Sequence, residues 1–123
     1  MGNKGFKDLA VRQKAKNLAV LIYRVPNSEM KSVDFGLKDQ IRRSSVRVAS
    51  NLAEGDERDT DKESVRYFFI AKGSVAELRT QLQIAHESGH LNGAIHETLE
   101  NEYATLSKRI GKHIQARRTS PRL

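Results

Sequence analysis

Residues 36–55 read GLKDQIRRSSVRVASNLAEG, and the spacing of their apolar side chains decides the fold class. One set of apolar or small side chains recurs at intervals of three or four residues: Leu37, Ile41, Ser45, Val48 and Leu52. This spacing places them on one side of an α-helix, while the opposite side is polar or charged. The stretch therefore predicts an amphipathic helix from about Phe35 to Glu54, with Gly55 as the glycine that ends it.

The same periodicity predicts three more helices, over about 6–25, 60–88 and 93–117. Pro26 ends the first of them, and Thr60 with Glu63 has the pattern of a capping box at the start of the third. Asn92 is a plausible N-cap of the fourth. No stretch has the alternating pattern of a strand.

Four helices of similar length joined by short connections favour antiparallel neighbours. We therefore expect an all-α fold, an antiparallel up-down-up-down four-helix bundle formed by residues 1–118 as a single domain. Residues 119–123 are expected to be a disordered basic tail. The alternative fold is a longer helical hairpin that completes its core by dimerising.

Residues 86–90, HESGH, match the H-E-x-x-H motif of zinc proteases. In those proteins both histidines lie on one continuous helix, so that both rings face the same metal ion. Here Gly89 stands between them at the end of the third apolar stripe, where a left-handed glycine would turn His90 away from His86. We therefore interpret the match as a coincidence and expect no metal site.

Composition restricts the class of protein. The 123 residues include 37% hydrophobic residues and no cysteine, which excludes a disulfide framework and a thiolate metal site. The apolar runs are too short to span a bilayer, and the N-terminal residues have no signal-peptide pattern. We expect a cytoplasmic protein that is not inserted in a membrane. No arrangement of side chains indicates a catalytic site, so we also expect a non-enzyme without a cofactor.

The net charge of +7 is concentrated near the C-terminus. From Tyr103 onward there are six Lys or Arg residues and no acidic residue, whereas the preceding residues hold 16 basic and 15 acidic side chains. Such an excess is typical of a segment that contacts a polyanion such as RNA or DNA, although a solvated tail would look the same.

Polar residues flank the apolar stripes of the second and third predicted helices. They predict a structural polar network between these helices, formed by Gln40, Arg43, Asn51, Glu54, Ser74 and Glu77. Within it, either Arg43 or Arg47 would pair with Glu77. The third helix is also apolar on its outer side, at Val65, Phe69 and Ala76. Since one bundle cannot bury both sides, we expect this face to be an oligomer interface.

Two blocks of residues resemble those of a known family. The first is Q-I-R-R followed by N-L-A-E-G at 40–43 and 51–55, and the second is A-x-G-S-x-x-E-L at 71–78. Over about residues 6–115 the chain resembles bacterial four-helix-bundle proteins, also called 23S rRNA intervening-sequence proteins. The resemblance implies a ring-shaped homo-oligomer, with a pentamer as the best guess. The accessory protein of diversity-generating retroelements looks like a distant relative, a basic barrel that works with a reverse transcriptase and RNA.

Two functions follow from these observations. The first is a non-enzymatic, oligomeric protein that binds RNA or another nucleic acid through basic faces. The alternative is a protein-binding scaffold or accessory subunit for a partner enzyme such as a polymerase or reverse transcriptase. The candidate contacts to nucleic acid are Lys38, Arg42, Arg47, Lys108, Arg109, Lys112, Arg117 and Arg118.

Overall fold

The computed structural model describes residues 2–30 and 34–119 and consists there of helices and connections, with no strand. The helices are α1 (Gly2–Tyr23), α2 (Asn27–Met30), α3 (Phe35–Asp56), α4 (Asp61–Glu87) and α5 (Gly93–Arg118). The four long helices correspond to the four that periodicity predicts. The short α2 was not predicted; it lies in the connection after Pro26 and brings Met30 into the core.

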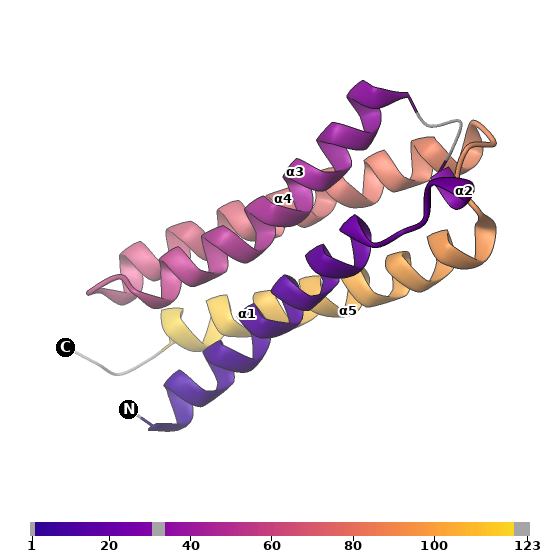
Figure 1. Ribbon diagram of the computed structural model, residues 1–123. Helices are drawn as coiled ribbons and strands as arrows, with labels where there is room; N and C mark the ends of the chain where they lie inside the picture. Colours follow the sequence, from indigo (N-terminus) through magenta and orange to yellow (C-terminus); the bar gives the residue numbers. More distant parts are fainter. Residues whose placement is uncertain (1, 31–33, 120–123) are drawn as a thin grey trace.

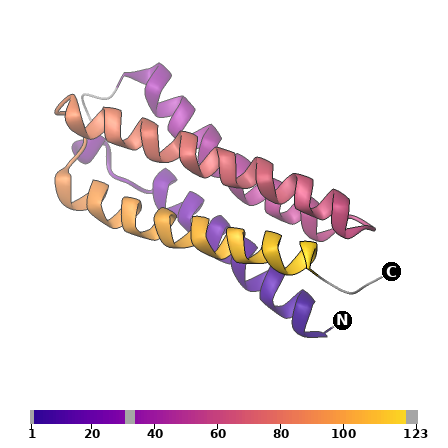
Figure 2. The same ribbon diagram turned by 180° about the vertical axis from the view of Figure 1, so that it is seen from behind.

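The long helices form an up-down-up-down bundle, in which the start of α1 and the end of α5 lie at the same end (Figure 1). Each of α1 and α4 packs against both α3 and α5, which places α3 diagonally opposite α5. Figure 2 shows α5 on the near side, flanked by α1 and α4. The predicted fold class is therefore confirmed. No helix among the described residues is long and apolar enough to cross a membrane.

Short polar side chains begin three of the helices. The Asp34 side chain accepts a hydrogen bond from the Leu37 N–H at 2.8 Å, and the Thr60 hydroxyl accepts one from the Glu63 N–H at 3.2 Å. The Asn92 side chain accepts bonds from the first turn of α5. Each of these bonds satisfies an N–H group that has no partner within its helix. The predicted N-caps at Thr60 and Asn92 are confirmed.

Helix α4 ends at a glycine, as predicted. Gly89 has a φ of 82°, a conformation that glycine adopts without a steric penalty. The Gly89 N–H donates to the His86 carbonyl and the His90 N–H to the Ala85 carbonyl, both at 2.9 Å. These two bonds form a Schellman motif. His90 therefore lies beyond the helix that carries His86.

Gly55 corrects a prediction, because it does not end α3. It lies inside the last helical turn, and the helix continues to Asp56 with Glu57 as its C-cap. Its role is steric: a Cβ at Gly55 would lie 2.6 Å from Phe68 Cε1. The Ser64 hydroxyl also donates to the Gly55 carbonyl at 2.7 Å. Glycine thus lets α3 and α4 approach closely at their shared turn.

The core follows the predicted stripes, with one addition from α4. Phe68 is fully buried, although helical periodicity does not predict it as a core residue. Val65, predicted to face outward, packs partly against this core, whereas Phe69 and Ala76 are exposed. Thr119 is the C-cap of α5, and the remainder of the predicted disordered tail lies outside the described residues.

Tyr103 is buried at the centre of the bundle, and its hydroxyl has no hydrogen-bond partner among the described residues. We expect Tyr103→Phe to keep or raise the free energy of unfolding at pH 7, by up to about 1 kcal/mol, because it removes an unsatisfied polar group. Urea unfolding of both proteins measures this difference. A loss above about 2 kcal/mol would indicate that the hydroxyl has a partner, such as a bound water.

The same residue makes stability depend on pH in the alkaline range. Burial raises the pKa of the Tyr103 phenol well above its ordinary value. The unfolded chain therefore loses this proton near pH 10 while the folded chain keeps it, so stability falls as pH rises above 10. This contribution, about 1.4 kcal/mol per pH unit, should be absent from Tyr103→Phe.

Candidate nucleic-acid interface

Polar side chains connect α3 to α4 along one side of the bundle. Arg47 Nη2 lies 3.0 Å from both Glu77 Oε1 and Ser44 Oγ, and the Ser44 hydroxyl donates to Gln81 Oε1 at 2.9 Å. Of the two arginines considered, Arg47 is therefore the partner of Glu77. The Arg47 and Glu77 side chains are 44% and 56% exposed, so this pair contributes at most about 1 kcal/mol.

The other predicted network residues bond within or near their own helix. Arg43 pairs with Asp39 at 3.0 Å, and Asn51 Nδ2 donates to the Arg47 carbonyl at 2.8 Å. Glu54 pairs with Arg58 one turn later. Ser74 is buried and Gln40 is exposed. Fewer of the predicted residues than expected therefore connect α3 to α4.

The predicted contacts on α3 are partly engaged within the protein. Arg47 bonds to Glu77, as described above. The Arg42 guanidinium lies 5.1 Å from the centre of the Tyr23 ring on α1, and it is half buried. Lys38 is also half buried and has an interaction within the protein. These three side chains are therefore less available to bind a phosphate than the sequence suggests.

Arg117 is not a surface residue. Its side chain is 7% exposed, lies 3.6 Å from Asp61 Oδ1 and stacks over the Phe68 ring at 5.2 Å. An arginine enclosed in this way exposes too little of its side chain to serve as a surface contact for a phosphate. The assignment of Arg117 as a nucleic-acid contact was therefore wrong, and its role is structural.

The other basic residues of α5 include a group on the outer surface. Lys108, Lys112 and Arg118 are exposed, whereas Arg109 is half buried. Lys72 of α4 joins this group across Gly111, where a Cβ would lie 3.7 Å from Lys72 Cε. We call Lys72, Lys108, Lys112 and Arg118 the α5 basic face. Lys72 was missed because its neighbours in the sequence are apolar.

An exposed aromatic ring accompanies this face. The Arg118 guanidinium lies 4.9 Å from the centre of the Phe69 ring, which is itself exposed. A guanidinium held over an aromatic ring keeps its charge and remains open to an anion on its outer side. Phe69, predicted as an interface residue, thus also lies beside the basic face.

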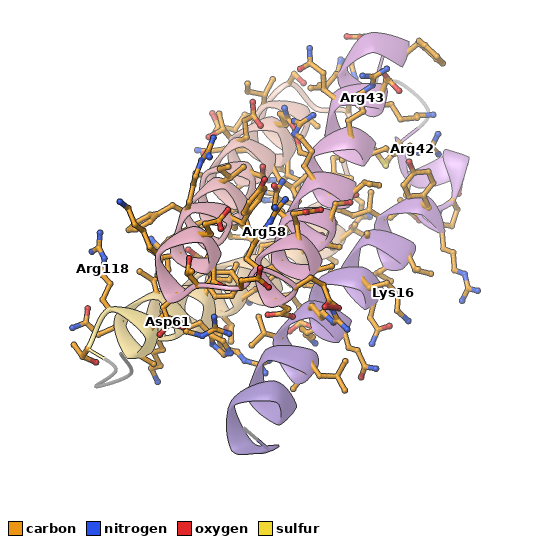
Figure 3. The ribbon with its side chains drawn as sticks, turned by 90° about the vertical axis from the view of Figure 1, so that its left-hand side faces the viewer. Lys16, Arg42, Arg43, Arg58, Asp61 and Arg118 are labelled. Atoms are coloured by element: carbon orange, nitrogen blue, oxygen red, sulfur yellow. The ribbon has the colours of Figure 1, made fainter. Side chains whose placement is uncertain are left out.

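The predicted basic residues do not form one continuous surface. One group of basic residues lies on α3 and the other on α5, and these two helices are diagonally opposite in the bundle. Figure 3 shows Arg118 at one side of the bundle and Arg42 and Arg43 at the other. The α5 basic face brings four exposed cations together, and no acidic residue follows Glu102 along α5.

Of the two histidines in the zinc-like motif, His86 contacts residues that follow α4. His86 Nδ1 is 3.1 Å from the Leu91 carbonyl oxygen, and the His86 ring stacks on the His96 ring with centroids 4.6 Å apart. Within residues 2–30 and 34–119, no group of three or more His, Asp or Glu side chains has the geometry to hold a metal ion.

Comparison with protein families places the chain. It matches the family described as "23S rRNA-intervening sequence protein" over residues 7–112, which includes all of α3 and α4 and most of α1 and α5. The chain belongs to the 23S rRNA-intervening sequence protein family. Both blocks of residues that carried the resemblance, 40–55 and 71–78, lie inside the matched range. None of the curated proteins matches the chain.

A solved structure supports the fold of this family member. It is a protein of unknown function from the S23 ribosomal protein family of Bacteroides thetaiotaomicron, with 20% sequence identity and a TM-score of 0.82. The similarity covers 89% of this chain and 98% of that chain, so the two share the whole bundle. At this identity the likeness concerns the fold alone, so the function of this chain must be argued from its own surface.

Proposed function

We propose that this protein is a non-enzymatic, cytoplasmic nucleic-acid-binding bundle that holds RNA through the α5 basic face. The carrying observation is that Lys72, Lys108, Lys112 and Arg118 are exposed on adjoining helices, while the last turns of α5 hold no acidic residue. The family description, which refers to a sequence within 23S rRNA, supports RNA as the polyanion.

The chemistry of this face favours contacts with phosphates. Lysine side chains act as mobile point charges that replace condensed counterions along a nucleic-acid backbone, and this gives affinity without sequence readout. Phe69 is the aromatic ring beside the face, and the Arg118 guanidinium already covers it. Stacking on bases therefore contributes little, and binding should depend strongly on salt.

The test is the paired substitution Lys108→Gln with Lys112→Gln. Removing two phosphate contacts should weaken binding of a single-stranded RNA about 10- to 30-fold near 0.1 M salt and reduce the slope of log K against log salt by about 1.4. Fluorescence anisotropy at several salt concentrations measures both quantities. Both side chains are exposed, so stability should stay within about 0.5 kcal/mol.

The matched control is Lys16→Gln with Arg24→Gln, which removes the same number of charges from exposed positions, one in α1 and one directly after it. RNA binding by this control should stay within about threefold of the parent, since its charges lie away from α5 and act only through screened, long-range attraction. If both pairs weaken binding equally, net charge rather than the α5 basic face determines affinity, and the proposal is wrong.

We further propose that the protein self-associates through the outer face of α4, defined by Phe69, Gly73 and Ala76. Phe69 and Ala76 are exposed, and a Cβ at Gly73 would meet nothing within 4 Å, so the helix backbone is open to a close neighbour. The family resemblance supports a ring, with five subunits as the best guess. Lys72 and Arg118 lie beside this interface. A ring would therefore repeat mainly the Lys108 and Lys112 part of the α5 basic face and strengthen binding through effective concentration.

Ala76→Arg tests this assembly without removing positive charge. A long charged side chain on the packed face should dissociate the oligomer, as measured by light scattering. If the subunits act together, RNA affinity should fall at least tenfold even though each chain gains a cation. An unchanged mass would exclude this face as the interface, and a monomer with unchanged affinity would exclude the cooperative part of the proposal.

A further inference from the structure

A groove runs along the surface between α1 and α3, on the side of the bundle away from the α5 basic face. It consists of two adjoining hollows, and both are lined by Lys16, Ala49 and Ser50. Because these residues are shared, the hollows form a single groove. Figure 3 shows Lys16 and Arg42 on the side where α1 and α3 adjoin, opposite Arg118.

The groove is apolar and open. Small side chains, Ala49 and Ala53, lie at its α3 wall. Four larger apolar side chains border it and are between 39% and 50% exposed: Leu9, Val20, Tyr23 and Val46. Nine large hydrophobic side chains are exposed in the described part of the chain, and these four gather at one place. Such a patch is typical of a surface that a partner covers.

The length of the groove suits a helix. The α1 residues that line it extend from Leu9 to Tyr23, which corresponds to about 20 Å along the helix axis at 1.5 Å per residue. A partner helix of about four turns would match this length, with apolar side chains at intervals of three or four residues placed over the small wall.

The rim of the groove is positively charged. Lys16 and Arg24 are exposed, and Arg42 lies over the Tyr23 ring at the edge. Arg12 also lines the groove but pairs with Asp56 at 3.6 Å. None of the described residues that line the groove is acidic. A complementary ligand must therefore combine an apolar stripe with carboxylates on its flanks.

We propose that this groove is a docking site for an amphipathic, acidic-flanked helix of a partner protein. A nucleic acid fits the rim but not the apolar wall. A second copy that brought its exposed apolar face on α4 would also bring the exposed cations that border that face, Arg66, Lys72 and Arg118. Like charges would then meet at the rim, which disfavours that pairing.

The experiment titrates the full chain with labelled 15-residue peptides. The first has leucines at positions 1, 4, 8 and 11 and glutamates on both flanks; the second has lysines in place of the glutamates; the third has a central proline that prevents a helix. We expect binding of the first peptide only, at least tenfold tighter than the other two, measured by fluorescence anisotropy. Equal binding of the lysine or proline peptide would overturn the proposal.

Substitutions in the protein locate the site. Val46→Lys adds a charged side chain at the exposed edge of the groove and should weaken the acidic peptide at least tenfold, even though it adds positive charge. The matched control is Ile84→Lys, the same type of change at an exposed position of α4 outside the groove, and it should stay within twofold. Similar effects of the two would overturn the assignment to the groove.

The charge pairs used for RNA separate this proposal from the nucleic-acid proposal. Lys16→Gln with Arg24→Gln should weaken the acidic peptide at least tenfold and leave RNA binding nearly unchanged, and Lys108→Gln with Lys112→Gln should do the reverse. If both double substitutions weaken the acidic peptide equally, net charge alone attracts the peptide and the assignment to the groove is wrong. If Val46→Lys lowers the oligomer mass in light scattering, a second copy occupies the groove and the proposal is wrong.

Discussion

Arg117→Ala should lower the free energy of unfolding by about 3 kcal/mol, because breaking a buried ion pair leaves the remaining charge without its partner. Arg117 is 7% exposed and lies 3.6 Å from Asp61, which belongs to the first turn of α4. The substitution also removes the guanidinium from the face of the Phe68 ring. Both losses occur at the end of the bundle where α4 starts and α5 ends, so that end should open first. Urea unfolding with hydrogen exchange of the α5 amides measures the effect.

The neighbouring residue supplies the control. Arg118→Ala removes an equal side chain from an exposed position and should change stability by less than about 0.5 kcal/mol. RNA binding should respond in the opposite order when measured where both variants are folded: Arg118→Ala weakens it, and Arg117→Ala leaves it nearly unchanged. A weakening of RNA binding by Arg117→Ala as large as that by Arg118→Ala would restore Arg117 to the contact surface.

The different roles of these two arginines show what charge counting misses. The sequence has both within a basic segment, and residue type alone assigns them one role. Their positions differ, however, since Arg117 continues the buried spacing of Ile110 and Ile114 while Arg118 is one residue past it. Helical position therefore predicts the burial of Arg117 better than its charge does. The ion pair with Asp61 depends on packing of α5 against α4, which no local pattern contains.

Helices and their caps were predictable because their causes are local. The stripe that includes Ile41 and Val48 is set by helical spacing, and Thr60, Gly89 and Asn92 act on groups within a few residues. Gly55 fits the same local pattern as Gly89, yet it has the opposite role because Phe68 approaches it from the next helix. Close approach between helices is a property of the tertiary structure, so the sequence could not distinguish the two glycines.

The candidate site was less predictable for the same reason. Similar arginines form ion pairs in different places: Arg43 pairs with Asp39 on its own helix, whereas Arg47 pairs with Glu77 on α4. The separation of the basic residues into two groups follows from the diagonal position of α3 and α5. Lys72, which completes the α5 basic face, becomes visible as a member only when α4 is packed beside Gly111.

The second large effect is expected for Gly55→Ala. Alanine favours a helix by about 1 kcal/mol relative to glycine, so helix propensity alone predicts stabilisation. The added Cβ would, however, lie 2.6 Å from Phe68 Cε1, 2.8 Å from Cδ1 and 3.2 Å from the Ser64 carbonyl oxygen. Phe68 cannot swing aside, because Arg117 covers its face and the His113 ring lies edge-on at 6.2 Å. Either α3 and α4 separate or the Phe68 ring leaves its rotamer, and the net cost should be about 2 kcal/mol.

Gly111→Ala is the matched control, since it places the same methyl group inside α5, where a Cβ would lie 3.7 Å from Lys72 Cε, an ordinary contact with a flexible side chain. Helix propensity acts there without opposition and should raise stability by about 0.5–1 kcal/mol. The two glycines should thus shift the urea midpoint in opposite directions. If Gly55→Ala also stabilises the protein, Phe68 has room to move and the close approach at the α3–α4 turn is not required. A destabilised Gly55→Ala that recovers when combined with Phe68→Leu would identify the ring as the group that needs the space, because the smaller side chain relieves the same contact.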